Sequence, residues 1–255
     1  IEDPDLLRLA GAGNASMNPA SGISDFENRV CQKGDKFIFE YDGEVYLRYE
    51  LTPNTGTMSD LAIFINDSLF LTPSQRSGPL PIVDGKMVTL TSLSPQLTAA
   101  ELEGDKVRLS FNFRYGDQQG KLEYEISIKE KTLIWQVNSQ QNFYATFNGG
   151  FELTDSDRVV EIPYYPAPVL TFERDGIWVS AFFDWNYTNS SRLEKEGPVA
   201  VYSPKTDGQR NNLAEIFYLV VSADIREVFP NIPNPESPYR ELLAQKVIFD
   251  FWGGW

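Results

Sequence analysis

Short runs in which apolar and polar residues alternate recur along most of this sequence. The clearest run is 121–128, where Leu, Tyr and Ile residues alternate with Lys, Glu and Ser. A period of two with one apolar face indicates an antiparallel strand whose other face meets water. Asp-Gly pairs at 42–43, 84–85 and 175–176 supply the residue types that hairpin turns require.

Similar patterns predict a long series of strands and very little helix. The expected strands are 36–41, 44–51, 61–65, 87–90, 106–115, 121–128, 132–137, 143–153, 158–162, 168–173, 176–184, 198–202 and 213–222. The only stretches with a helical pattern are 95–102 and 237–245, and both are short. Strand after strand joined by turns predicts an all-β fold, a large antiparallel sandwich of two stacked sheets.

The chain divides into three unequal parts. Residues 1–30 are rich in Gly, Ala, Asn and Ser, which predicts a loosely ordered N-terminal segment that packs on the sandwich. The sandwich itself is expected over 31–228. Four prolines between 229 and 239 favour an extended linker, because proline supports neither a ladder nor a helix. An apolar run at 246–255 follows, and we interpret it as the first strand of a further domain.

Charge and composition exclude several classes of function. The 255 residues carry a net charge of −14, which argues against nucleic acid or an anionic membrane surface as a partner. No apolar run is long enough to span a bilayer. The sequence has no histidine and one cysteine, Cys31. This excludes a Ser-His or Cys-His nucleophile and the usual zinc, copper or haem sites, so any acid–base chemistry falls to carboxylates, Tyr or Lys.

A calcium site built from oxygen ligands is compatible with the sequence, and no other cofactor is predicted. Glu152, Asp155 and Asp157 lie close together in a predicted loop. Carboxylate and carbonyl oxygens are the ligands that Ca²⁺ takes in proteins. These three residues are therefore the candidate Ca²⁺ ligands.

Polar and aromatic residues concentrate in two segments, 182–192 and 202–215. Aromatic faces and hydrogen-bonding side chains together suit a carbohydrate site. The alternatives are that the aromatics pack the sandwich while the polar groups tie down loops, or that the segments contact a neighbouring domain. The candidate carbohydrate-binding residues are Asp184, Trp185, Tyr187, Asn189, Arg192, Tyr202, Lys205, Asp207, Arg210, Asn211 and Glu215. No catalytic residue is predicted.

The last third of the sequence resembles a family. The stretches 202–212, 221–224, 228–239 and 247–254, with the Asp-Trp and Ser-Ser pairs of 182–192, are similar to a block in large glycoside-hydrolase-like proteins of the endo-α-N-acetylgalactosaminidase clan. The resemblance implies a galactose-mutarotase-like β-supersandwich that precedes a (β/α)8 barrel. The catalytic carboxylates of that clan lie in the barrel. Mutarotases of this fold use histidine for acid–base work, and this chain has none.

Three functions follow as hypotheses. The first is a non-catalytic accessory domain of a carbohydrate-active enzyme, which contributes glycan contacts or buttresses a catalytic barrel in the same parent chain. The second is a stand-alone lyase, epimerase or hydrolase that uses Tyr and carboxylates. The third is a lectin-like binding module. An oligo- or polysaccharide is the expected partner, and the resemblance implies an extracellular or periplasmic location.

Overall fold

The computed structural model describes residues 26–116, 118–160, 168–184, 187–188 and 190–228, and most of them lie in strands. None of the helices in these ranges is long and apolar enough to cross a membrane. The short helices are η1 (Met58–Asp60), η2 (Leu90–Leu93) and α2 (Ile225–Val228). The strands are β1 (Glu27–Lys33), β2 (Lys36–Asp42), β3 (Tyr46–Leu51), β4 (Leu61–Ile65), β5 (Ser68–Leu71), β6 (Gly78–Val83), β7 (Lys86–Met87), β8 (Gln96–Glu103), β9 (Lys106–Tyr115), β10 (Gln118–Lys129), β11 (Thr132–Ser139), β12 (Tyr144–Asn148), β13 (Arg158–Val159), β14 (Leu170–Arg174), β15 (Ile177–Phe183), β16 (Ser191–Leu193), β17 (Pro198–Val201) and β18 (Leu213–Ser222).

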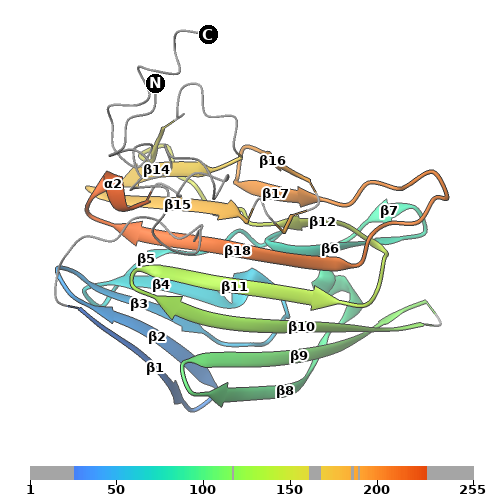
Figure 1. Cartoon of the computed structure of the whole chain (residues 1–255), viewed down its shortest axis with the longest axis horizontal. Coiled ribbons are helices and arrows are strands. Elements are labelled where there is room, and N and C mark those ends of the chain that lie inside the picture. Colours follow the sequence, from blue (N-terminus) through green and yellow to red (C-terminus); the bar gives the residue numbers. More distant parts are fainter. Residues whose placement is uncertain (1–25, 117, 161–167, 185–186, 189, 229–255) are drawn as a thin grey trace, which may run out of the picture.

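These strands form three antiparallel sheets (Figure 1). A first five-stranded sheet has the order β1-β2-β3-β4-β5. The largest sheet has eight strands in the order β13-β14-β15-β18-β11-β10-β9-β8. A second five-stranded sheet has the order β16-β17-β12-β6-β7. The predicted all-β antiparallel sandwich is confirmed, although three sheets take the place of the expected two.

One hydrophobic core joins the inner faces of all three sheets. Alternation decides which side chains enter it: Phe37 and Phe39 of β2 are buried in the core, as are Leu122 and Tyr124 of β10. Full burial of a side chain of this size stabilises the fold by roughly 1.5–3 kcal/mol. The buried hydroxyl of Tyr124 donates to the carbonyl oxygen of Gly56 at 2.6 Å, so the core carries no unmet hydrogen bond at that point.

Two of the three Asp-Gly pairs form the predicted tight hairpin turns. Asp84-Gly85 joins β6 to β7 and Asp175-Gly176 joins β14 to β15, and all four residues have positive φ, as a type I′ turn requires. Asp42-Gly43 does not form such a turn. Strand β3 begins at Tyr46 rather than at 44, and neither Asp42 nor Gly43 has positive φ. The longer loop leaves Glu44 available for a contact described below.

Other elements depart from the predictions in ways that pairing explains. The predicted helix at 95–102 is wrong: this segment is β8, which pairs with β9 along the edge of the large sheet. The predicted strand at 87–90 ends early, and Leu90 begins η2 instead. Strand β1 begins at Glu27, four residues before the predicted start of the sandwich. The predicted helix at 237–245 and the segment 229–255 lie outside the described residues.

The turn between β10 and β11 carries a buried lysine that contacts three elements. Lys131 is 7% exposed. Its ammonium group pairs with Glu44 of the β2–β3 loop and with Glu227 of α2. It also lies 5.4 Å from the centre of the Tyr41 ring. These four residues, the Lys131 cluster, tie the first sheet, the large sheet and α2 together.

Opposing effects set the pKa values in the Lys131 cluster. Burial lowers the pKa of Lys131, but the carboxylates of Glu227 and Glu44 outweigh burial and hold the pKa above its ordinary value. Burial raises the pKa of Glu44, while hydrogen bonds from Lys131 and Tyr41 bring the net pKa below its ordinary value. The Tyr41 hydroxyl donates to Glu44 at 2.5 Å. Lys131 and Glu44 are therefore both charged at neutral pH.

Candidate functional site

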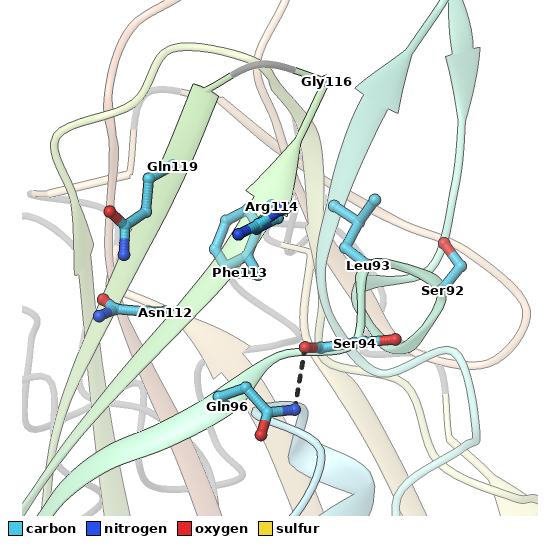
Figure 2. A pocket seen from close by; sticks show the side chains of 9 residues that line it. All are labelled: Ser92, Leu93, Ser94, Gln96, Asn112, Phe113, Arg114, Gly116 and Gln119. Atoms are coloured by element: carbon cyan, nitrogen blue, oxygen red, sulfur yellow. Dashed lines mark hydrogen bonds between the residues drawn. The ribbon is translucent and has the colours of Figure 1, made fainter.

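A groove lies beside η2 at the end of the large sheet where the β9–β10 turn is found. Its cavity volume is about 890 Å³, within the range of small-molecule sites. Figure 2 shows side chains from β9 and β10 on one side and from η2 and the start of β8 on the other. The lining residues are Ser92, Leu93, Ser94, Gln96, Asn112, Phe113, Arg114, Gly116 and Gln119.

Strand register brings the polar lining residues together. Gln96 of β8 is paired with Asn112 of β9, and Arg114 of β9 is paired with Gln119 of β10. Asn112 and Arg114 are two residues apart on one strand, so they share a face of the sheet. Four hydrogen-bonding side chains from three strands therefore lie on adjacent positions of one surface. The pairing of β8 with β9 shifts register just beyond Gln96.

The opposite wall is built by η2 and the residue that ends it. Leu90 is fully buried and anchors the helix in the core. Ser94 ends η2 with a φ of 48°, and its amide donates to the carbonyl oxygen of Thr91 at 3.1 Å. Ser94 is one of six non-glycine residues with positive φ in the described ranges, and the other five lie in hairpin turns. The side-chain amide of Gln96 donates to the Ser94 carbonyl oxygen at 3.2 Å, which links the wall to β8 (Figure 2).

An aromatic side chain packs on the core face of β9, behind the polar residues on the other face of this strand. Phe113 is 3% exposed and meets Phe143 edge to face, with ring centres 6.0 Å apart. Gly120 of β10 is directly opposite Phe113 in the register. A Cβ atom at position 120 would lie closer to the Phe113 ring than two carbon atoms can approach. Glycine at this position therefore lets the ring pack flat against the strand.

The lining chemistry favours binding over catalysis. Amide groups come from Gln96, Asn112 and Gln119, and hydroxyl groups come from Ser92 and Ser94. Such groups both donate and accept hydrogen bonds, as sugar hydroxyls do. Arg114 is the only charged residue among the nine that line the groove. Among the nine described lining residues there is no carboxylate, lysine, cysteine or tyrosine, so none of these nine side chains is suited to act as a general acid or base.

The residues predicted from sequence are spread over both faces of the large sheet. Asp184 follows β15, is 4% exposed, and accepts a hydrogen bond from the Tyr218 hydroxyl at 3.0 Å. Tyr218 packs with Phe182 in a small cluster separate from the main core. Because side chains alternate along β18, Tyr218 and Phe217 point to opposite faces, and Phe217 lies in the main core. Asp184 is thus on the outer face.

Glu215 and Tyr202 lie on the inner face instead. Glu215 is 2% exposed, alternates with the core residues Leu213 and Phe217, and accepts a hydrogen bond from the Tyr202 hydroxyl. Burial, followed by the nearby carboxylate, raises the pKa of Tyr202 far above its ordinary value. Arg210 donates to the carbonyl oxygen of Tyr202 at 2.9 Å. These contacts hold the start of β18 against the residue that follows β17, and Tyr202 is buried from solvent.

The remaining predicted residues occupy loops. Lys205 and Asp207 form an exposed turn, in which the Asp207 carboxylate accepts from the amide of Gln209 at 2.9 Å. Tyr187 is 67% exposed. Asn211 is partly buried just before β18, and Arg192 lines a second cavity of about 140 Å³ while it pairs with Glu194. Trp185 and Asn189 lie outside the described residues.

The candidate calcium ligands do not converge in the structure. Two of the three guanidinium nitrogens of Arg174, Nε and Nη2, donate to the Asp157 carboxylate at 2.6 Å, and this contact holds the pKa of Asp157 below its ordinary value. Glu152 contributes its backbone carbonyl oxygen to the same arginine at 3.1 Å, and Asp155 is exposed. No group of three metal-ligating side chains occurs within the described ranges.

Comparison with known proteins gives distant structural similarities. No family model and no curated protein matches the sequence. The chain is similar to the Slr1438 protein from Synechocystis sp. PCC 6803, with a TM-score of 0.42 and 11% identity over 84% of this chain and 100% of that chain. It is also similar to a putative aldose 1-epimerase from Escherichia coli K12, with a TM-score of 0.42 and 9% identity over 78% and 99% of the two chains. At this similarity, function has to be inferred from the groove itself.

Proposed function

We propose that this chain is a non-catalytic glycan-binding domain and that the groove beside η2 is its binding site. The observation that carries the proposal is the lining itself, which combines three side-chain amides and two hydroxyls with the half-buried side chain of Leu93. Sugars present hydroxyls and apolar C–H patches together, so they need this combination of partners.

The position of the acidic residues supports a binding role over a catalytic one. Of the acidic residues that the sequence singled out, Glu215 is buried on the core side and Asp157 is neutralised by Arg174. General acid–base catalysis needs a titratable group within hydrogen-bond reach of the substrate. The groove offers none among its described lining residues.

The family resemblance gives this binding role a context. We infer that the domain accompanies a catalytic domain of a carbohydrate-active enzyme and holds the polysaccharide near it. In that role the groove would supply glycan contacts and the catalytic carboxylates would belong to the partner domain. An extracellular or periplasmic location is part of the same proposal.

Glycan-array binding followed by titration calorimetry tests the proposal. The purified chain should bind at least one oligosaccharide. The double variant Asn112→Ala/Gln119→Ala should weaken that binding at least tenfold, because two hydrogen-bonding amides are lost from the groove. Circular dichroism should show an unchanged fold, since Gln119 is exposed and Asn112 is half-buried.

A matched control comes from β11. Asn138 and Gln136 are exposed on the same large sheet, away from the groove. The variant Asn138→Ala/Gln136→Ala should bind as the original chain does. Equal loss of binding in the two double variants would place the site elsewhere, and no binding to any glycan would overturn the proposed function.

A further inference from the structure

Most arginine side chains in the described part of the chain are neutralised internally. Six form ion pairs with carboxylates: Arg29, Arg48, Arg108, Arg158, Arg174 and Arg192. Arg210 donates to a backbone carbonyl oxygen. Arg76 and Arg114 have no acidic partner within the described residues, and both line cavities. Unpaired guanidinium groups are therefore found where a ligand could supply the missing anion.

Arg114 is the more informative of the two. It is exposed on β9, next to Gln119 of β10 and two residues from Asn112. The second cavity around Arg76 also holds Glu194 and Glu196, whereas the groove contains no carboxylate among its described lining residues. The described lining of the groove thus carries one positive charge on a chain whose net charge is −14. Such a local field favours an anionic group over a neutral one.

The guanidinium group also indicates how such an anion is bound. Its planar donors match the two oxygens of a carboxylate and form two parallel hydrogen bonds with it. The neighbouring amides and hydroxyls match ring hydroxyls. A carboxylate attached to a sugar ring satisfies both sets of groups at once.

We propose that the groove binds an acidic saccharide, a chain containing uronic acid residues, and that Arg114 pairs with a uronate carboxylate. The inference rests on the proposed glycan-binding function and names the class of glycan. Asn112 and Gln119 bind the hydroxyls of the same or the adjacent sugar. The half-buried side chain of Leu93 provides the apolar contact.

Calorimetric titration with matched pairs of ligands tests the inference. The probes are tetrasaccharides of galacturonate, mannuronate, guluronate and hyaluronan, each compared with its carboxyl methyl ester. At least one acidic tetramer should bind about tenfold more tightly than its ester, because esterification removes the charge-assisted pair. Raising the salt concentration should weaken binding of the acid more than binding of the ester.

The variant Arg114→Gln should bring the affinity for the acidic tetramer down to that for its ester, a loss of about tenfold. Arg76→Gln changes the net charge equally and is the control; it should leave the affinity unchanged. Exposed side chains are replaced in both, so thermal unfolding should show intact folding.

Failure of the inference is distinguishable from failure of the proposed function. Equal binding of acid and ester, unchanged affinity in Arg114→Gln, or an equal loss in Arg76→Gln would each overturn the choice of acidic saccharides. Binding of neutral oligosaccharides alone would do the same and leave the glycan-binding function standing. No binding to either the acidic or the neutral sets would overturn both.

Discussion

The two ends of β10, a strand of the large sheet in Figure 1, differ in how their charged side chains are paired. At the end that begins with Gln118, the groove is open and Arg114 has no acidic partner among the described residues. At the end that finishes with Lys129, the Lys131 cluster is buried and pairs one lysine with two carboxylates. A paired, buried charge fixes the packing of three elements. An unpaired, exposed charge is available to a ligand, so the stabilising cluster and the proposed binding site lie at opposite ends of one strand.

The largest effect is expected from Lys131→Ala. The substitution leaves the carboxylates of Glu44 and Glu227 facing each other without a cation. Removing one partner of a buried pair destabilises a protein by roughly 3–5 kcal/mol. Glu44 is 38% exposed, so we expect the lower end, about 3 kcal/mol, measured by urea unfolding. Exposed Lys129→Ala is the control, with a change within about 0.5 kcal/mol. Equal effects of the two variants would refute a stabilising role for the cluster.

A smaller loss is expected from Gly120→Ala at the other end. The added methyl group meets the ring of Phe113, and overpacking of this kind destabilises by about 2 kcal/mol. In a Phe113→Leu background the same substitution should destabilise less, because the smaller side chain yields space. A double-mutant cycle by chemical unfolding measures this coupling. Strict additivity of the two changes would show that ring and glycine do not interact.

The dependence of stability on acid pH tests the Lys131 cluster through Glu44. The pKa of Glu44 in the folded protein lies below its ordinary value of 4.5. Its contribution to stability is therefore present above pH 4.5 and is lost as the pH falls through the folded pKa. Glu44→Gln should flatten the dependence of the unfolding free energy on pH below this value. Exposed Glu101→Gln is the control, and an unchanged acid slope in Glu44→Gln would contradict the assignment.

The smallest effect on stability is expected from Arg114→Gln. The side chain is exposed and forms no ion pair within the described residues, so the unfolding free energy should change by less than about 0.5 kcal/mol. Thermal unfolding without ligand measures it. A loss as large as that of Lys131→Ala would mean that Arg114 supports the fold, and the contrast between the two ends of β10 would disappear.

Sequence reasoning predicted the fold class because alternation is local. Each alternating run indicates its own buried face. Two of the three Asp-Gly pairs form the hairpin turns that the sequence predicts. The edge strand β8 was predicted as a helix because 95–102 contains Ala, Leu and Glu, which favour helices. Pairing with β9 overrides that preference. The longer loop at Asp42-Gly43 likewise depends on a long-range contact, that of Glu44 with Lys131.

The candidate site was harder to predict, because the register between neighbouring strands brings its residues together. The amide side chains of the groove come from separate positions in the sequence, and each resembles an ordinary solvent-facing residue of a strand. They belong to Gln96, Asn112 and Gln119. Only the alignment of three strands brings them together. The position of Glu215, in contrast, is visible in the sequence: it alternates with Leu213 and Phe217, which places it on the core face. Grouping residues by their proximity along the chain missed both points.

The packing of Phe113 on Gly120 implies a rule for how this domain can diverge. The ring of Phe113 fills the space that a side chain at position 120 would need, so neither position can change alone. In related sequences the two sites should vary together, with a side chain at 120 only where 113 has become small.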